Sequence, residues 1–250
     1  MALPRLACIV VSLFPLAARL RSEPELAREA VVIVEGNGSA ARVVTASRLA
    51  RRAGVRPGLT LPQARALIPK LVARPRDAEC ERAAQEALLE VAERFSPRVE
   101  DAGEGVAYLE VDGIDRRFRP AGRKPSSAPD GAEEEGAGPT PPTSPASPAT
   151  PESMMGSALL AAAEAACLPA KVGIASSKLA ARIAAGLPGL TSSPAIVPVG
   201  EEAVFLAPLP LARLSPAAET PGPPAAGAAR TWGSPASPGT AGTPGNPGII

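Results

Sequence analysis

Two proline-rich segments limit the part of this chain that can fold. The chain has 31 prolines and 23 glycines among its 250 residues, and many of them gather in residues 114–155 and 216–250. Segments of this composition cannot bury enough apolar surface to offset the entropy lost on ordering. We therefore expect a disordered Pro/Ser/Glu-rich insert at 114–155 and a disordered tail at 216–250, which leaves residues 6–113 and 156–215 to fold.

Composition also excludes several classes of site. The chain has no histidine, which rules out a Ser-His-Asp triad and any histidine-ligated metal. Cys8, Cys80 and Cys167 form no CxxC pair, so zinc and thioredoxin-type sites are not expected. A net charge of +1 argues against a globally basic nucleic-acid binder but leaves a local basic patch open. Only 2% of residues are aromatic, so the core must consist mainly of Ala, Leu and Val.

The sequence does not predict a membrane protein. The apolar run at residues 7–18 is interrupted by Pro15 and has no strongly basic segment before it, so we do not expect a signal peptide. No stretch approaches the roughly 20 apolar residues of a membrane-spanning helix. We expect a cytoplasmic protein.

Apolar periodicity predicts alternating strands and helices. Continuous β-branched runs and alternating segments predict strands at residues 8–14, 31–34, 42–45, 71–73, 106–112, 171–175 and 196–199. Apolar stripes at helical spacing and capping residues predict helices at 16–21, 46–53, 61–68, 77–95, 157–167, 176–186 and 201–206. This order is typical of an α+β fold with a ferredoxin-like sheet, helices on one face and a small helical subdomain.

Two segments carry more specific features. In residues 106–112 an apolar row of Ala107, Leu109 and Val111 alternates with Tyr108, Glu110 and Asp112, which predicts a half-buried strand. Residues 35–39 (EGNGS) contain an Asn-Gly pair that predicts a hairpin turn. A glycine-rich phosphate loop is the alternative, although a lone GxG without a following Lys-Ser/Thr gives it little support.

Five separated blocks together resemble the Y-family, or lesion-bypass, DNA polymerases. They occur in the family's order: a buried strand ending at Phe14, TASRLARRAGVRPGLTLPQA (45–64), FSPRVE (95–100), AYLEVDG (107–113) and VGIASSKLAARIAA (172–185). The resemblance spans residues 6–214 apart from the insert. It implies a polymerase palm sheet formed by residues 6–45, 76–113 and 156–200. It also implies a fingers-like subdomain at 46–75 and the start of a thumb at 201–215.

Within that family the chain is most similar to the ImuB-like branch. The similarity lies in Ala7-Cys8 followed by Phe14-Pro15-Leu16. Members of this branch are thought to lack catalysis and to act with an error-prone replicative-type polymerase and a RecA-like accessory protein in SOS mutagenesis. The resemblance therefore implies an adaptor in DNA repair and translesion synthesis.

The resemblance also implies that three metal-binding carboxylates are missing. Their positions are Val10, Gly105 and Val106. Nucleotidyl transfer uses two metal ions, and magnesium requires oxygen ligands at about 2.0–2.1 Å, which valine and glycine side chains cannot supply. Glu110 lies about 13 Å along an extended strand from Val106, and Glu104 would lack a partner on the first strand. We expect no catalytic residue, metal or cofactor, with Mg²⁺ relevant only if the chain is an active polymerase.

Some substrate-side positions keep basic residues. By resemblance, Arg48, Arg51, Lys178 and Arg182 are candidates for contacts with DNA or a triphosphate, although Arg48 replaces a tyrosine. The alternative is that they form a solvated basic helix face. Weak, salt-sensitive DNA binding is expected through five arginines of one segment, Arg42, Arg48, Arg51, Arg52 and Arg56.

Two aromatic side chains have competing interpretations. Phe14 lies near the family's sugar-gate position, and ordinary core packing is the alternative. Tyr108 is expected to pack at the sheet edge rather than to stack on a base.

The resemblance ends near residues 209–214, and the tail shows no clamp-binding peptide, so a sliding clamp is not expected as a partner. Three hypotheses stay open at this point. The chain is a non-catalytic adaptor, an active divergent nucleotidyltransferase that uses Glu104, or a non-functional fragment whose residues 216–250 reflect truncation or a change of reading frame.

Overall fold

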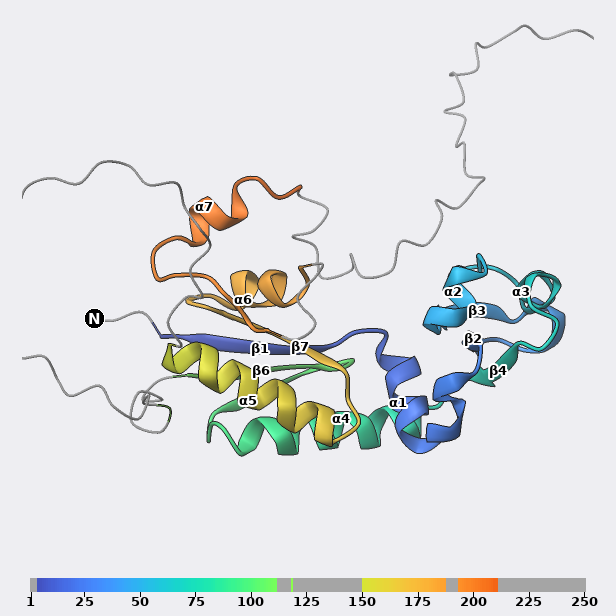
Figure 1. The fold of residues 1–250 in the computed structure, drawn as a ribbon, viewed down its shortest axis with the longest axis horizontal. Coiled ribbons are helices and arrows are strands. Elements are labelled where there is room, and N and C mark those ends of the chain that lie inside the picture. Colours follow the sequence, from blue (N-terminus) through green and yellow to red (C-terminus); the bar gives the residue numbers. More distant parts are fainter. Residues whose placement is uncertain (1–3, 112–117, 119–149, 188–192, 211–250) are drawn as a thin grey trace, which may run out of the picture.

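The computed structural model describes residues 4–111, 118, 150–187 and 193–210 (Figure 1). The expected tail at 216–250 and most of the expected insert at 114–155 lie outside these residues. The described chain forms two sheets with helices packed around them, which confirms the α+β class.

The larger sheet has five strands in the order β5-β6-β1-β7-β8. Its central strand, β1 (Leu6–Val11), pairs antiparallel with β6 (Val106–Glu110) on one side and with β7 (Ala170–Ala175) on the other. The flanking strands are β5 (Val99–Gly103) and β8 (Ala195–Ile196). A continuous apolar run suits the central place, because both faces of β1 are buried.

Helices cover both faces of this sheet (Figure 1). On one face Ala7, Ile9 and Val11 pack with α1 (Phe14–Ser22), α4 (Ala78–Glu93) and α5 (Pro151–Ala165). On the other face Cys8 and Val10 pack beneath α6 (Lys178–Ala185), which continues toward α7 (Glu202–Leu206). The sequence predicted helices on one face only. The second layer forms because the other half of the β1 run is equally apolar and must also be buried.

The smaller sheet belongs to a separate lobe. Its order is β3-β2-β4, formed by β2 (Val31–Glu35), β3 (Arg42–Ala46) and β4 (Val72–Pro75). Short 3₁₀ helices occupy Pro24–Arg28 and Gly38–Ala40, and α2 (Arg48–Arg52) and α3 (Leu61–Leu67) complete the lobe. A distinct core of small apolar side chains holds it together, including Val32, Val43, Ala50, Val55 and Ala64.

This pairing differs from the sequence-based arrangement, which placed residues 6–45 together in the palm. The hairpin of β2 and β3 pairs with β4 and not with β1. Hairpin signals are local, so they predict that two strands pair with each other but not which sheet they join.

Most predicted elements exist, but some of their ends differ. The first strand ends at Val11 and not at Phe14, which begins α1, because Leu13 takes a left-handed backbone that breaks the strand. Helix α5 also occupies residues 151–155, which the expected insert included. Strand β5 was not predicted, because three of its five residues are exposed, two of them charged, and they show no buried alternation. Helix α5 begins at Pro151, a favourable first-turn residue, with Thr150 as its cap. Thr60 caps α3 and forms a capping box with Gln63. No helix within the described ranges is long and apolar enough to cross a membrane.

Candidate functional site

The structure brings Val10, Gly105 and Val106, the three positions expected to lack a carboxylate, close together. Val10 on β1 lies directly opposite Val106 on β6 in the antiparallel register. The carbonyl of Gly105 accepts a 2.8 Å hydrogen bond from the backbone N–H of Val11. Directly opposed residues in such a ladder have Cα atoms about 4.5–5.5 Å apart. Carboxylates at positions 10 and 106 would therefore lie close enough to share a metal ion, whereas the valines there offer no oxygen ligand.

Gly105 occupies a place that a side chain cannot enter without displacing Phe14. A Cβ atom at Gly105 would lie 2.6 Å from Cδ2 and 2.8 Å from Cγ of the Phe14 ring. The backbone of Gly105 is left-handed, with φ of 81°, which also favours glycine. Phe14 is 6% exposed and packs in the main core. The ring therefore covers the space where an acidic side chain at position 105 would begin, and a sugar-gate role for Phe14 stays a prediction.

Gln85 of α4 fixes the hairpin that carries Gly105. Its carbonyl oxygen accepts a 2.8 Å hydrogen bond from the N–H of Gly105, and its amide nitrogen donates to Asp101 Oδ1 at 2.6 Å and to the carbonyl of Val106 at 3.2 Å. Sequence reasoning missed Gln85 because a lone polar residue on a helix gives no motif. These three hydrogen bonds fix the turn against α4.

The donor set at this point of the sheet does not fit a pair of magnesium ions. Val10, Gly105 and Val106 offer no side-chain oxygen. In the part of the chain that the structure describes, no three His, Cys, Asp or Glu side chains cluster in a way that could hold a metal ion. We therefore derive no metal-dependent step for these residues.

The two nearby acidic residues point elsewhere. The Glu104 side chain is 86% exposed and lies 3.8 Å from Arg76. Glu110 lies at the far end of β6, opposite Leu6, and its carboxylate pairs with Arg98 at 2.7 Å. Neither carboxylate is therefore placed beside Val10 and Val106.

The two basic candidates of α6 gather around Tyr108. Lys178 forms an ion pair with Glu100 of β5, and its ammonium lies 5.7 Å from the centroid of the Tyr108 ring. Burial raises the pKa of the Tyr108 hydroxyl and Cys8 adds to the rise, while a hydrogen bond with Arg182 opposes it. Tyr108 is therefore a neutral, 8%-exposed side chain beneath α6. It does not lie at the sheet edge, because β5 covers β6 on that side.

The other basic candidates lie on α2 in the smaller lobe. Arg48, Arg51 and Arg52 are exposed on this short helix, which Ser47 caps. Two neighbours are oriented by backbone carbonyls, since Arg56 donates to Arg51 O at 2.6 Å and Arg42 donates to Gly58 O at 3.0 Å. The candidates thus divide into an α2 group and an α6 group on separate cores.

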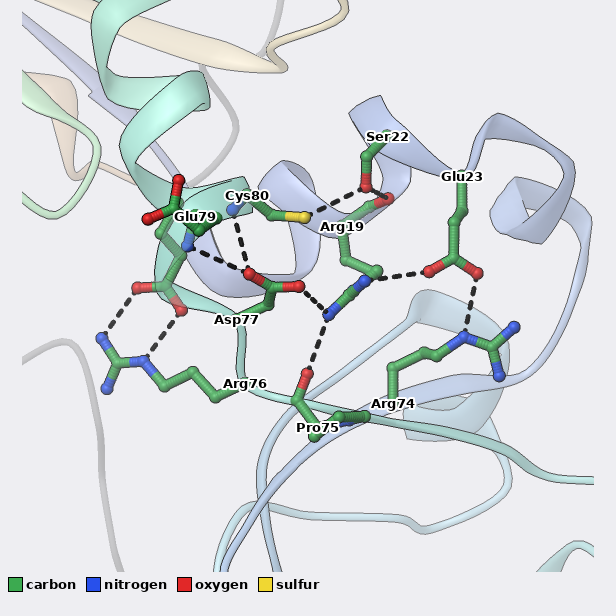
Figure 2. Close-up of polar contacts among 10 residues, drawn as sticks. Arg19, Ser22, Glu23, Arg74, Pro75, Arg76, Asp77, Glu79 and Cys80 are labelled. Carbon is green, nitrogen blue, oxygen red and sulfur yellow. Dashed lines mark hydrogen bonds and ion pairs between the residues drawn. The ribbon is translucent and has the colours of Figure 1, made fainter.

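A polar network joins the two lobes, and we call it the lobe-junction network: Arg19, Glu23, Arg74, Pro75 and Asp77 (Figure 2). Arg19 of α1 donates to Glu23 at 3.0 Å, to the carbonyl of Pro75 at 3.1 Å and to Asp77 at 3.0 Å. Glu23 also accepts from Arg74 at 2.9 Å. One guanidinium thus holds both chain segments that connect the lobes.

The charges of this network are favoured by its hydrogen bonds. The Arg74 guanidinium holds the pKa of Glu23 below its ordinary value, and Arg19 contributes in the same direction. The N–H of Cys80 lowers the pKa of Asp77, whose side chain caps α4. The network has no sequence motif. The one feature of the sequence that could have indicated it is the i,i+4 spacing of Arg19 and Glu23, which suits an ion pair on a helix.

Comparison with known proteins shows which family the chain matches and which solved structures share its fold. Residues 9–186 match the model of the impB/mucB/samB family. Among solved structures, DinB from Sulfolobus solfataricus is similar with a TM-score of 0.56 and 16% identity over 81% of this chain and 50% of that chain. Dbh DNA polymerase in an insertion ternary complex is similar with a TM-score of 0.57 and 17% identity over 87% of this chain and 54% of that chain. No curated protein matches.

The structural likeness at these identities shows a shared fold, and the chain spans about half the length of those polymerases. The family match is broader evidence, because it covers most of the chain and includes all three positions that lack a carboxylate. This protein therefore belongs to the impB/mucB/samB family, the Y-family of lesion-bypass DNA polymerases.

Proposed function

We propose that this chain is a non-catalytic, ImuB-like subunit that acts as an adaptor in damage-induced, mutagenic translesion synthesis. The observation that supports it best is the site itself. Val10 and Val106 face each other and Gly105 lies beside them, so the architecture of a two-metal site is kept while its ligands are lost. The Phe14 ring fills the space next to Gly105, so no cavity is left there for a side chain.

An adaptor needs a fold that engages DNA and partner proteins without chemistry. The exposed arginines of α2 and the basic groups of α6 support DNA as a partner. We assign the five-stranded sheet to the palm and residues 31–75 to the fingers. We further propose that an error-prone replicative-type polymerase supplies catalysis and that a RecA-like protein completes a cytoplasmic complex, as the ImuB-like resemblance implies.

Primer extension tests the proposal directly. The purified chain is incubated with a primed template, all four deoxynucleotides and Mg²⁺, and products are resolved at single-nucleotide length. We expect no extension, because Val10, Gly105 and Val106 cannot hold the metal pair. DNA binding by the same preparation, measured in parallel, shows that the sample is folded and competent.

One outcome would overturn the non-catalytic assignment. Templated extension that disappears in Glu104→Ala would identify Glu104 as a metal ligand and the chain as an active, divergent polymerase. The current position of Glu104, exposed and next to Arg76, gives that alternative no geometric support.

A further inference from the structure

The outer strand of the larger sheet has a free edge. Strand β5 pairs with β6 on one side, and no described strand pairs with it on the other. The backbone N–H of Glu110 donates to the carbonyl of Arg98, and Glu100 lies opposite Tyr108 in the same register. Hydrogen-bonded and non-bonded pairs alternate along antiparallel strands, so every second residue of β5 turns its backbone groups outward. The edge therefore offers backbone donors and acceptors to another strand.

Val99 and Asp101 carry these outward groups. By the alternation, Arg98 and Glu100 bond to β6, so the N–H and C=O of Val99 and Asp101 point away from it. Within the described ranges the backbone of Val99 and Asp101 forms no other hydrogen bond. The register shifts between Asp101 and Gly103, which ends the regular edge. An extended peptide could therefore form a short ladder on this segment, as in recognition by strand addition.

The charges along this edge select the partner. Three exposed carboxylates lie on or beside β5, those of Glu100, Asp101 and Glu104. Lys178 pairs with the first of them and Arg76 lies near the last. Within the described ranges Asp101 forms no ion pair, and its carboxylate accepts two hydrogen bonds from uncharged N–H groups. The edge therefore keeps an excess of negative charge, which favours a strand with lysine or arginine side chains.

A second copy of the chain does not fit the same edge. Two β5 strands paired about a two-fold axis would place Glu100 and Asp101 against the same carboxylates of the copy. Like charges directly opposed across strands are destabilising, and charged side chains on an edge strand commonly prevent self-association. The free backbone groups are therefore protected from self-pairing, whereas a basic strand is attracted to them.

We propose that the free edge of β5 is a docking site for an extended basic segment of a partner protein, which adds a strand to the five-stranded sheet. The N–H and C=O groups of Val99 and Asp101 supply the main-chain hydrogen bonds, and the Asp101 carboxylate pairs with a lysine or arginine of the incoming strand. This contact involves neither the α2 arginines nor the positions that lack a carboxylate. Primer extension by the chain would overturn the non-catalytic assignment and leave this docking site unaffected.

Fluorescence anisotropy with a labelled peptide of alternating lysine and valine residues tests the docking site. We expect the full chain to bind this peptide, and N-methylation of the peptide backbone, which removes its donors, should weaken binding by about tenfold. Asp101→Asn keeps the oxygen that accepts from Gln85 and removes the charge, so it should weaken binding by about threefold. Glu164→Gln, at an exposed carboxylate of α5, is the matched control and should leave the affinity unchanged.

Hydrogen exchange shows where the peptide binds. The amides of Val99 and Asp101 should exchange quickly in the free chain and slowly when the lysine–valine peptide is bound. Three results would overturn the inference: no binding of this peptide, equal binding of its N-methylated form or of a glutamate–valine peptide, and equal effects of Asp101→Asn and Glu164→Gln. Protection of the two amides before the peptide is added would also overturn it. Another segment of the chain, or a second copy where protection rises with concentration, would then occupy the edge.

Discussion

At the scale of single residues, the contact between Gly105 and Phe14 decides what can be placed at the turn before β6. Two glycines flank Glu104 in the same hairpin, and both have left-handed backbones, with φ of 71° at Gly103 and 81° at Gly105. They differ in their surroundings, because a Cβ at Gly103 meets nothing within 4 Å whereas a Cβ at Gly105 meets the Phe14 ring. Substitutions at Gly103 and Gly105 therefore distinguish the cost of backbone strain from the cost of steric overlap with Phe14.

We predict that Gly105→Ala destabilises the fold more than Gly103→Ala. The Gly103 variant adds only left-handed strain, about 1–2 kcal/mol. The Gly105 variant adds that strain and the displacement of a buried ring, about 1–3 kcal/mol more. Urea unfolding with an unchanged m-value measures both. Equal midpoints for the two variants would show that Phe14 moves aside freely, and a carboxylate could then be introduced at position 105.

At the scale of elements, the lobe-junction network ties α1 to the entry of α4 and to β4. The folded state holds the carboxyl groups of Glu23 and Asp77 below their ordinary pKa values of 4.5 and 3.8. The folded chain therefore binds fewer protons than the unfolded chain in mild acid. Their stabilising contribution is complete above those values and is lost as pH falls through the lowered folded-state pKa.

We predict that the melting temperature of the wild type falls more steeply below about pH 4.5 than that of Glu23→Gln, which has no carboxylate to protonate at this position. Thermal melts from pH 7 to pH 3 measure this difference. Glu25→Gln is the control, since this exposed carboxylate makes no ion pair within the described chain. Parallel pH profiles for the wild type and Glu23→Gln would show that the network does not contribute through its charge.

The sequence predicted most of the helices and strands, but it did not predict which strands pair with each other over long distances in the chain. The 16-residue α4 follows directly from its apolar stripe of Ala84, Leu88 and Val91 and from its cap at Asp77. Strand β5 gave no signal, because an edge strand with exposed Glu100 and Asp101 looks like a loop. The partition into two sheets depends on contacts between distant residues, and a single sequence does not encode these as local patterns.

The same division holds within the candidate site. The absence of carboxylates at Val10, Gly105 and Val106 could be read by resemblance alone. Their convergence needed the register of β1 and β6. The Gln85 contacts could not be inferred, because Gln85 belongs to no motif and its contacts depend on which elements become neighbours.

At the scale of the whole molecule, basic groups are carried by both lobes, so DNA affinity should depend on each. We predict that Arg48→Ala combined with Arg51→Ala weakens binding to duplexes of unrelated sequence by similar factors. The slope of log affinity against log salt should fall by about 2, since two phosphate contacts are lost. Fluorescence anisotropy across a salt series measures both quantities.

A variant with Arg28→Ala and Lys70→Ala removes two exposed charges elsewhere and serves as the control. If its salt slope changes as much as that of the α2 variant, the affinity follows net charge and the α2 arginines form only a solvated basic helix face.

The lobe-junction network also shows how the smaller lobe is attached. The chain leaves the larger body after Glu23 and returns at Pro75, and Arg19 contacts both points. The smaller lobe is therefore an insertion with adjacent ends and its own core, a geometry that suits its excision or replacement. We expect that a short linker in place of residues 30–75 would leave β1, α1 and α4 packed against one another as they are now. Leu16 and Leu20 of α1 pack in one cluster with Val31 and Ile33, so these two side chains would lose their cover.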